Sequence, residues 1–131
     1  MILIDSSVWI DYFNGNQTSK TDWLDSSVGN TPIIIGDLIL TEVLQGFQSE
    51  KDFKIAKDLL LNIPFVTLGG KALALESAMN YRILRREGVA VRKTIDIIIG
   101  TFCIHNQLSL LHCDRDFDPM VKFLGLKIID I

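Results

Sequence analysis

Short, mostly apolar runs alternate along the chain with longer segments in which apolar residues recur every three or four positions. The short runs are bounded by polar residues, Gly or Pro, which is typical of buried β-strands. We therefore predict five strands, at Met1–Ile4, Pro32–Ile35, Pro64–Leu68, Leu108–Cys113 and Leu126–Ile131.

The segments between these strands have helical periodicity. Asp37, after Gly36, is expected to cap one helix, and Gly88 to follow the end of another. Asp118 is expected to cap the last helix, with Pro119 at its first helical position. The most apolar segment is typical of a fully buried helix. The predicted helices cover residues 37–44, 52–61, 72–86, 94–106 (the most apolar) and 118–123.

This alternation predicts an α/β fold, in which a central parallel sheet of about five strands is flanked by helices on both faces. The chain has 131 residues, of which 48% are apolar, and we expect residues 1–131 to form a single domain. In such folds ligands bind beyond the carboxyl ends of the strands, where the strand order changes direction. The polar residues that directly follow strands, Asp5 and Asp114, are therefore the first candidates for function.

Charge and composition narrow the class of protein. The net charge of −3 argues against a module that binds DNA through overall positive charge, but it leaves room for a nuclease with an acidic centre. The N-terminus has no secretory signal, and the least charged stretch, residues 97–113, is too short to span a bilayer. Cys103 and Cys113 lack metal-binding spacing, and we expect both to be buried thiols in a reducing compartment. These features predict a soluble, cytoplasmic protein with no membrane partner.

Four acidic residues occupy unusual positions. Asp5 and Asp114 follow predicted strands, Glu42 lies at the edge of an apolar helical stripe, and Asp96 begins the most apolar helix. Each also has an ordinary alternative. Asp5 can be a helix cap, Glu42 a boundary residue that reaches water, and Asp96 a first-turn residue favoured by the helix dipole.

Together these carboxylates predict a metal site. Carboxylates that converge in one cleft repel each other, and a hard divalent cation such as Mg²⁺ removes that penalty. Asp116 is a further acidic candidate, and the hydroxyl of Ser6 or Ser7 is placed to bond a metal-bound water or a phosphate. An acidic metal centre of this kind suits phosphodiester hydrolysis.

A basic stretch directly precedes Asp96. Five of the 13 basic residues lie between Arg82 and Lys93, against the single acidic Glu87. Such a patch would bind phosphates with little sequence preference, and Arg92 and Lys93, with Arg86, are the members we expect to contact RNA. The ordinary alternative is a solvated helix end whose cations suit the dipole.

Four motifs in order along the chain resemble the PIN-domain family, and within it the VapC toxins of type II toxin–antitoxin systems. The resemblance covers essentially the whole chain. The motifs are Met1–Asp11 with Asp5-Ser6-Ser7 at its centre, Leu40-Thr41-Glu42-Val43, Thr94-Ile95-Asp96, and Leu110–Phe117 with Asp114 and Asp116.

The resemblance implies an endoribonuclease that uses Mg²⁺, with Mn²⁺ as the alternative ion. Its catalytic residues would be Asp5, Glu42, Asp96 and Asp114, and the metal would be held by Asp5, Asp96 and Asp114. Ser6 and Asp116 would support them. The implied partners are RNA, a second copy of the chain, and a VapB-type antitoxin that inserts a C-terminal segment into the active-site groove.

One departure from the family pattern and several alternatives remain open. Many members have a threonine at the position of His112, and a neutral imidazole can make an equivalent hydrogen bond. A PIN-domain RNA-processing nuclease without a toxin role is one alternative, and a Mg²⁺-binding phosphoacceptor receiver-type domain is another. Trp9, Tyr12, Phe13 and Trp23 are equally compatible with a core and with a partner surface.

Overall fold

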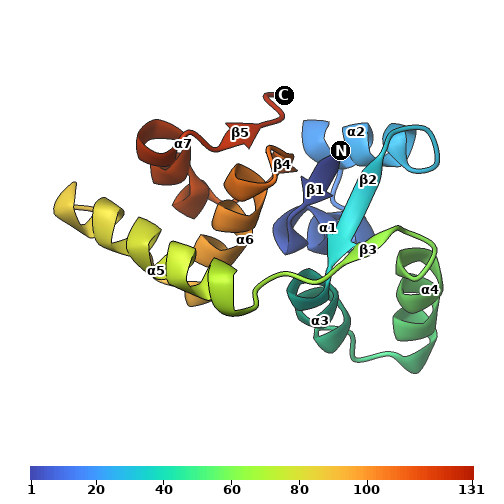
Figure 1. Cartoon of the computed structure of the whole chain (residues 1–131). Helices are drawn as coiled ribbons and strands as arrows, with labels where there is room; N and C mark the ends of the chain where they lie inside the picture. Colours follow the sequence, from blue (N-terminus) through green and yellow to red (C-terminus); the bar gives the residue numbers. More distant parts are fainter.

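A five-stranded parallel sheet forms the centre of the computed structural model, which describes residues 1–131 (Figure 1). The strand order is β3-β2-β1-β4-β5, and all four neighbouring pairs are parallel. The predicted five-stranded parallel sheet is therefore confirmed, although every strand except β2 is shorter than its apolar run. The strands are β1 (Ile2–Ile4), β2 (Ile33–Gly36), β3 (Phe65–Val66), β4 (Ser109–Leu111) and β5 (Lys127–Ile128).

The central strands are buried on both faces. Leu3 of β1 pairs with Ile34 of β2 and with Leu110 of β4, and all three side chains are at most 2% exposed. Parallel strands covered on both sides need apolar residues at successive positions, which explains the uninterrupted apolar run at the N-terminus. Register is thus set by burial rather than by alternation of polar and apolar residues.

Seven α-helices and one 3₁₀ helix connect the strands. Helix α2 was not predicted, because its sequence is largely polar and buries only Thr21, Leu24 and Ser27. A reciprocal capping box between Thr18 and Thr21 begins this helix. The helices are α1 (Ser6–Phe13), α2 (Ser19–Ser27), α3 (Asp37–Gln45), α4 (Glu50–Leu60), α5 (Lys71–Arg86), α6 (Thr94–His105), η1 (Arg115–Phe117) and α7 (Asp118–Leu124).

Two predicted helix caps are wrong. Gly36, rather than Asp37, is the N-cap of α3, and the Asp37 carboxylate instead accepts hydrogen bonds from the backbone N–H groups of Leu38 and Leu68. Phe117, rather than Asp118, precedes α7, because η1 runs directly into this helix. In both cases the aspartate is the first residue of the helix, where its charge still suits the dipole.

The chain reverses its direction across the sheet between β1 and β4. The connections from β1 to β2 and from β2 to β3 move one way, and α5 and α6 then lead back to β4 beside β1. Because such crossovers are right-handed, α1 and α3 cover one face of the sheet, and α5 and α6 the other. Figure 1 shows α5, α6 and α7 grouped on one side and α3 and α4 on the other. The switch point, where ligands bind in folds of this kind, thus lies between β1 and β4.

Helix α6 is the central helix of its face. Ile97, Ile99 and Cys103 are buried, and Gly100 lies so close to Met120 of α7 that a methyl group would collide with it. The helix predicted at residues 94–106 is therefore confirmed, but it is not fully buried, because Ile95, Ile98 and Ile104 are partly exposed. None of the helices combines the length and the apolar character that crossing a bilayer would require.

Helix α5 leaves large apolar side chains on its surface. Leu73, Ser77 and Leu84 face the interior, whereas Leu75 and Met79 are each 62% exposed. Leu75 and Met79, which are one helical turn apart, therefore form an exposed apolar stripe on this helix.

The N-terminal aromatic residues belong to the core. Trp9 is fully buried, stacks on Phe13 with ring centroids 5.9 Å apart, and contacts Tyr12 edge to face. Trp23 is partly buried against the same core. Of the two interpretations open for this cluster, the structure supports the core for Trp9.

Candidate active site

Asp5 lies at the carboxyl end of β1 and is also the N-cap of α1. Its Oδ2 accepts hydrogen bonds from the Ser7 backbone N–H (3.1 Å) and the Ser7 hydroxyl (2.5 Å). The residue is 3% exposed, and its Oδ1 has no hydrogen-bond partner. Burial raises the pKa of this carboxyl, although the bonds from Ser7 oppose the rise. The capping role expected as an alternative is real, and it leaves one carboxylate oxygen free.

Glu42 reaches the site from α3. Its Oε1 accepts a 3.0 Å hydrogen bond from the Ser6 hydroxyl in the first turn of α1. The side chain is half-buried at the edge of the apolar stripe, as predicted. Partial burial raises the pKa of Glu42, and the charges of Asp5 and Asp114 add to the rise. Ser6 therefore ties this carboxylate to the segment that carries Asp5.

Asp96 lies in the first turn of α6 and is a buried carboxylate. It is 3% exposed, and its Oδ2 is buried without a hydrogen-bond partner. Burial raises its pKa to about 6, Lys93 opposes the rise, and Asp5 and Asp114 contribute to it. A buried carboxylate without a donor is unfavourable unless a cation compensates it.

Asp114 and Asp116 follow β4. Oδ1 of Asp114 accepts a 2.9 Å bond from the Asp116 N–H, which caps the 3₁₀ helix η1. Burial opposes the effect, but this bond and Lys93 hold the pKa of Asp114 below its usual value. Asp96, Asp114 and Asp116 each offer a carboxylate oxygen, and these oxygens lie within 4.8 Å of one another.

These three carboxylates form an acidic cluster that fits a metal ion. Carboxylate oxygens are the ligands that hard divalent cations prefer, and Asp96 has a buried oxygen that accepts no hydrogen bond. Asp116, expected only as a supporting residue, belongs to this closest set. Asp5 and Glu42 lie outside it, but their charges act on Asp96. Sequence position could not show this, because only the folded turn after β4 brings both Asp114 and Asp116 close to Asp96 of α6.

Two cations predicted to contact RNA are paired with this cluster. Arg92 forms a two-pronged ion pair with Asp116, with its Nη2 3.0 Å from Oδ1 and its Nε 3.3 Å from Oδ2. Lys93 Nζ lies 3.3 Å from Asp114 Oδ2 and 3.7 Å from Asp96 Oδ2. Arg86, at the end of α5, is exposed and forms no ion pair.

His112 supports the turn that carries Asp114. Its Nδ1 accepts a 3.2 Å hydrogen bond from the Asp114 N–H, and its ring packs against Phe117. Burial lowers the pKa of the imidazole, and the nearby Lys20 lowers it further. Lys20 of α2 also donates a hydrogen bond to the His112 carbonyl. Sequence reasoning missed Lys20, which lies far from every motif.

The two cysteines differ from the prediction. Cys103 is buried, and burial raises the pKa of its thiol to about 12. Cys113 is exposed, because β4 ends at Leu111 and the chain turns outward there. The expectation that both thiols are buried is therefore wrong for Cys113. Neither forms a disulfide.

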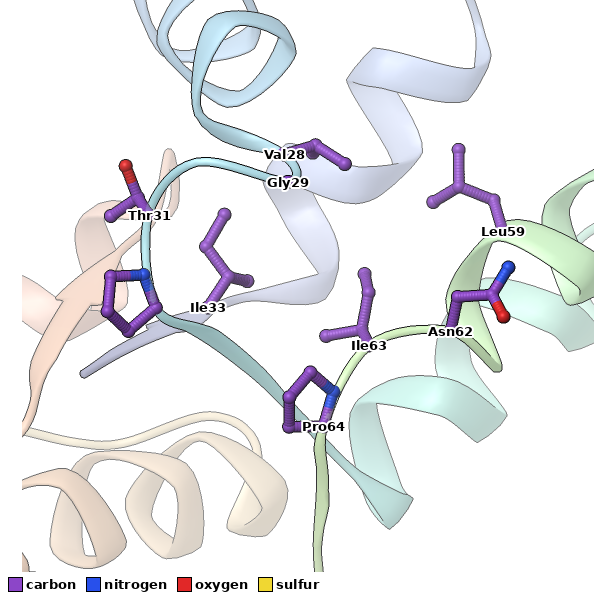
Figure 2. Close-up of a pocket in the computed structure, with 9 residues that line it drawn as sticks. Val28, Gly29, Thr31, Ile33, Leu59, Asn62, Ile63 and Pro64 are labelled. Atoms are coloured by element: carbon purple, nitrogen blue, oxygen red, sulfur yellow. The ribbon is translucent and has the colours of Figure 1, made fainter.

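A separate cavity lies at the opposite end of the sheet. It has a volume of about 360 Å³ and lies between the segment that enters β2 and the one that enters β3 (Figure 2). Its polar side chains are those of Thr31 and Asn62, and the Asn62 amide already donates to the Asp58 carbonyl. No charged side chain lines this cavity, and we assign it no catalytic role.

Comparison with known proteins identifies the family. A sequence model of the PIN domain matches residues 2–122. The chain therefore belongs to the PIN-domain family. The receiver-type alternative does not hold, because those domains order their strands differently.

The chain is similar over nearly its whole length to two proteins named as ribonucleases. One is ribonuclease VapC11 of Mycobacterium tuberculosis, 26% identical over 129 residues, which cover 97% of this chain and 96% of the relative. The other is VapC ribonuclease Mb1587 of Mycobacterium bovis, with the same identity and coverage.

Solved structures share the fold. VapBC2 from Rickettsia felis, bound to a DNA fragment from its promoter, superposes with a TM-score of 0.78 at 15% identity, covering 100% of this chain and 99% of the other. VapBC-1 from nontypeable Haemophilus influenzae has a TM-score of 0.75 at 14% identity, covering 99% and 98%.

Proposed function

We propose that this chain is a metal-dependent endoribonuclease and the toxin of a VapBC type II toxin–antitoxin pair. One domain spanning residues 1–131 would carry the activity. Support comes from the PIN-domain match and from similarity over the whole length to VapC ribonucleases. A reducing cytoplasm, where its RNA substrate would be found, agrees with the two unpaired cysteines.

The observation that carries this proposal is the set of carboxylates at the switch point. Asp5 follows β1, Asp114 follows β4, and the Asp5 N–H donates a 2.9 Å bond to the Leu111 carbonyl, which holds the two strand ends together. Asp5 Oδ1 and Asp96 Oδ2 are buried oxygens that accept no hydrogen bond. Buried oxygens without a hydrogen bond, on neighbouring acids, fit a cation better than they fit a purely structural role.

In the proposed mechanism Asp5, Asp96 and Asp114 hold Mg²⁺ or Mn²⁺, with Asp116 beside them. The bound ion would lower the pKa of a water molecule and offset the charge that develops on the scissile phosphate. Glu42, half-buried and fixed by Ser6, would accept a hydrogen bond from the attacking water and so orient it. The attacking water would release its proton to solvent as its oxygen bonds the phosphorus, and solvent would protonate the leaving 3′ oxygen, so the step requires neither a histidine base nor a histidine acid.

Substrate phosphates would contact the cations beside the acidic cluster. Arg86 is exposed and unpaired, and Arg92 keeps a side chain that is 71% exposed although it contacts Asp116. Lys93 lies at the inner end of the same basic stretch. Contacts of this kind bind RNA with little sequence preference and weaken as salt rises.

A homodimer and a VapB-type antitoxin complete the proposal. The similar solved structures are VapBC complexes, which supports an antitoxin partner. For the homodimer we favour the exposed stripe of α5. Leu75 and Met79 lie on it, beside an apolar cavity of about 420 Å³ between α5 and α6.

Induction in a bacterial host tests the function. The wild-type protein, Asp96→Asn and the charge-matched surface variant Asp58→Asn are expressed in parallel, and the 5′ ends of total RNA are sequenced. We expect new, discrete 5′ ends and growth arrest with the wild type and Asp58→Asn only. A fully active Asp96→Asn protein would contradict the assignment. Cleavage of purified RNA that stops when a chelator is added and resumes with Mn²⁺ tests the metal dependence.

The toxin role has its own test. A PIN-domain RNA-processing nuclease without a toxin role would cut RNA in the same assay without growth arrest. Co-expression of a VapB-type partner should abolish both effects if the chain is a toxin.

A further inference from the structure

Lys93 places a positive charge between two carboxylates of the acidic cluster. Its Nζ lies 3.3 Å from Asp114 Oδ2 and 3.7 Å from Asp96 Oδ2. Lys93 is the N-cap residue of α6, so its side chain extends over the first turn of the helix to Asp96, three residues on. The ammonium group thus lies beside the buried oxygen for which the protein provides no hydrogen bond.

Its neighbour Arg92 makes a different contact. The Arg92 guanidinium bonds both oxygens of Asp116, and its side chain is 71% exposed. Lys93 is 53% exposed and contacts Asp96, whose side chain is 4% exposed. Of the two cations, only Lys93 reaches the interior of the cluster.

A divalent ion and this ammonium group would need the same oxygen atoms. Both favour oxygens of Asp96 and Asp114, and two cations within a few ångströms of each other repel strongly where water is partly excluded. The lysine stem is flexible and half-exposed, so the ammonium can move to solvent while Asp96 stays in place.

We propose that Lys93 is the internal counter-cation of the metal-free site and that it exchanges with the divalent ion. The inference rests on the metal centre of the proposed function. It assigns Lys93 a role distinct from RNA contact, because the exchange takes place without substrate. Since linkage is reciprocal, an ammonium that metal displaces must itself weaken metal binding.

Calorimetric titration of the purified full-length protein with Mn²⁺ tests the exchange. We compare the wild type with Lys93→Gln, with Asp96→Asn, and with Lys54→Gln, which removes the same charge from an exposed position on α4. We expect roughly tenfold tighter binding for Lys93→Gln, within the usual range of coupling between two sites. Lys54→Gln should match the wild type, and Asp96→Asn should lose binding.

Thermal unfolding gives a second signature. In chelator, Lys93→Gln should unfold at a lower temperature than the wild type, because the carboxylates lose their counter-cation. At saturating Mn²⁺ the two proteins should unfold at the same temperature, because the wild-type Lys93 has then left the site and no longer stabilises the carboxylates. An equal loss of stability under both conditions would show a merely structural lysine and would overturn the exchange.

The remaining outcomes separate this inference from the proposed function. If the wild type binds no Mn²⁺, the metal centre and the exchange both fail. If Asp96→Asn abolishes binding but Lys93→Gln binds no more tightly than Lys54→Gln, the exchange alone is overturned and the metal centre stands.

Discussion

The Ser6 hydroxyl donates a 3.0 Å hydrogen bond to Oε1 of Glu42 and thereby joins the first turn of α1 to α3. Asp5 directly precedes α1, and Glu42 lies on a helix that follows a different strand. The bond therefore sets the distance between two acids that are remote in sequence. It also restrains a carboxylate whose pKa is raised by partial burial.

Ser6→Ala should lower RNA cleavage about tenfold, because Glu42 loses a hydrogen bond to its charged form, an interaction of about 1.5 kcal/mol. The fold should be retained, since the serine contributes little apolar contact. Cleavage rates under single-turnover conditions provide the measurement. Ser26→Ala, which removes a comparable hydroxyl bonded to the Trp23 carbonyl on the surface, is the matched control and should leave the rate unchanged.

Asp96→Asn should reduce cleavage by at least about a hundredfold while it stabilises the metal-free protein. At pH 7.5 in chelator we expect a gain of roughly 1–2 kcal/mol in the free energy of unfolding, because an amide relieves the buried, repelled charge without leaving a cavity. The gain is less than the full pKa shift implies, since Lys93 and water already screen the carboxylate. Denaturant unfolding of both proteins measures it, and a destabilised variant would contradict the prediction.

Stability and metal binding should depend on pH in opposite directions. The pKa of Asp96 is raised from 3.8 to about 6, so the folded metal-free protein holds a proton that the unfolded chain has released in this interval. The contribution of Asp96 to the free energy of unfolding should therefore fall as pH rises from about 4 to about 6 and then level off.

Metal affinity should follow the reverse trend, because protons compete for the same carboxylate. Mn²⁺ titrations at pH 5 and pH 7.5 should show weaker binding at the lower value. Equal affinity at both pH values would show that Asp96 is not a ligand.

Trp9→Ala should destabilise the protein by about 3–5 kcal/mol, the usual cost of removing a fully buried aromatic side chain. The ring is fully buried and contacts Phe13 and Tyr12. Trp23→Ala, which removes a partly buried ring from the same region, should cost clearly less. Urea unfolding of the isolated chain compares them. Full stability of Trp9→Ala, with loss of antitoxin binding alone, would favour a partner surface instead.

Leu75→Glu and Met79→Glu should convert the proposed dimer to a monomer without unfolding it. Both side chains are 62% exposed on α5, so a charge there is solvated in the monomer and buried in the interface. Sedimentation or light scattering gives the mass. Ile55→Glu alters a side chain of similar exposure on α4 and should leave the dimer intact. A wild type that is monomeric at high concentration would refute the dimer itself.

Much of the fold was determined by local sequence. Uninterrupted apolar runs mark strands buried on both faces, and their alternation with helical segments permits few topologies other than a parallel sheet. Asp5 and Asp114 could be selected as candidates because carboxyl ends of parallel strands meet at one edge of a sheet. Helix α2 was not predicted because its sequence is largely polar. A capping box and the burial of three side chains stabilise it instead.

Only the tertiary structure decided how the candidate site is assembled. Asp116 joins Asp96 and Asp114 because only three residues separate η1 from β4, and η1 places the Asp116 carboxylate close to Asp96 of α6. Lys93 lies between carboxylates, and Lys20 supports His112 across 92 positions of sequence. Sequence determines which residues carry charge and which segments must be buried. The distances between charges far apart in the chain, and hence their pKa values and pairing, arise only when the strands are in register.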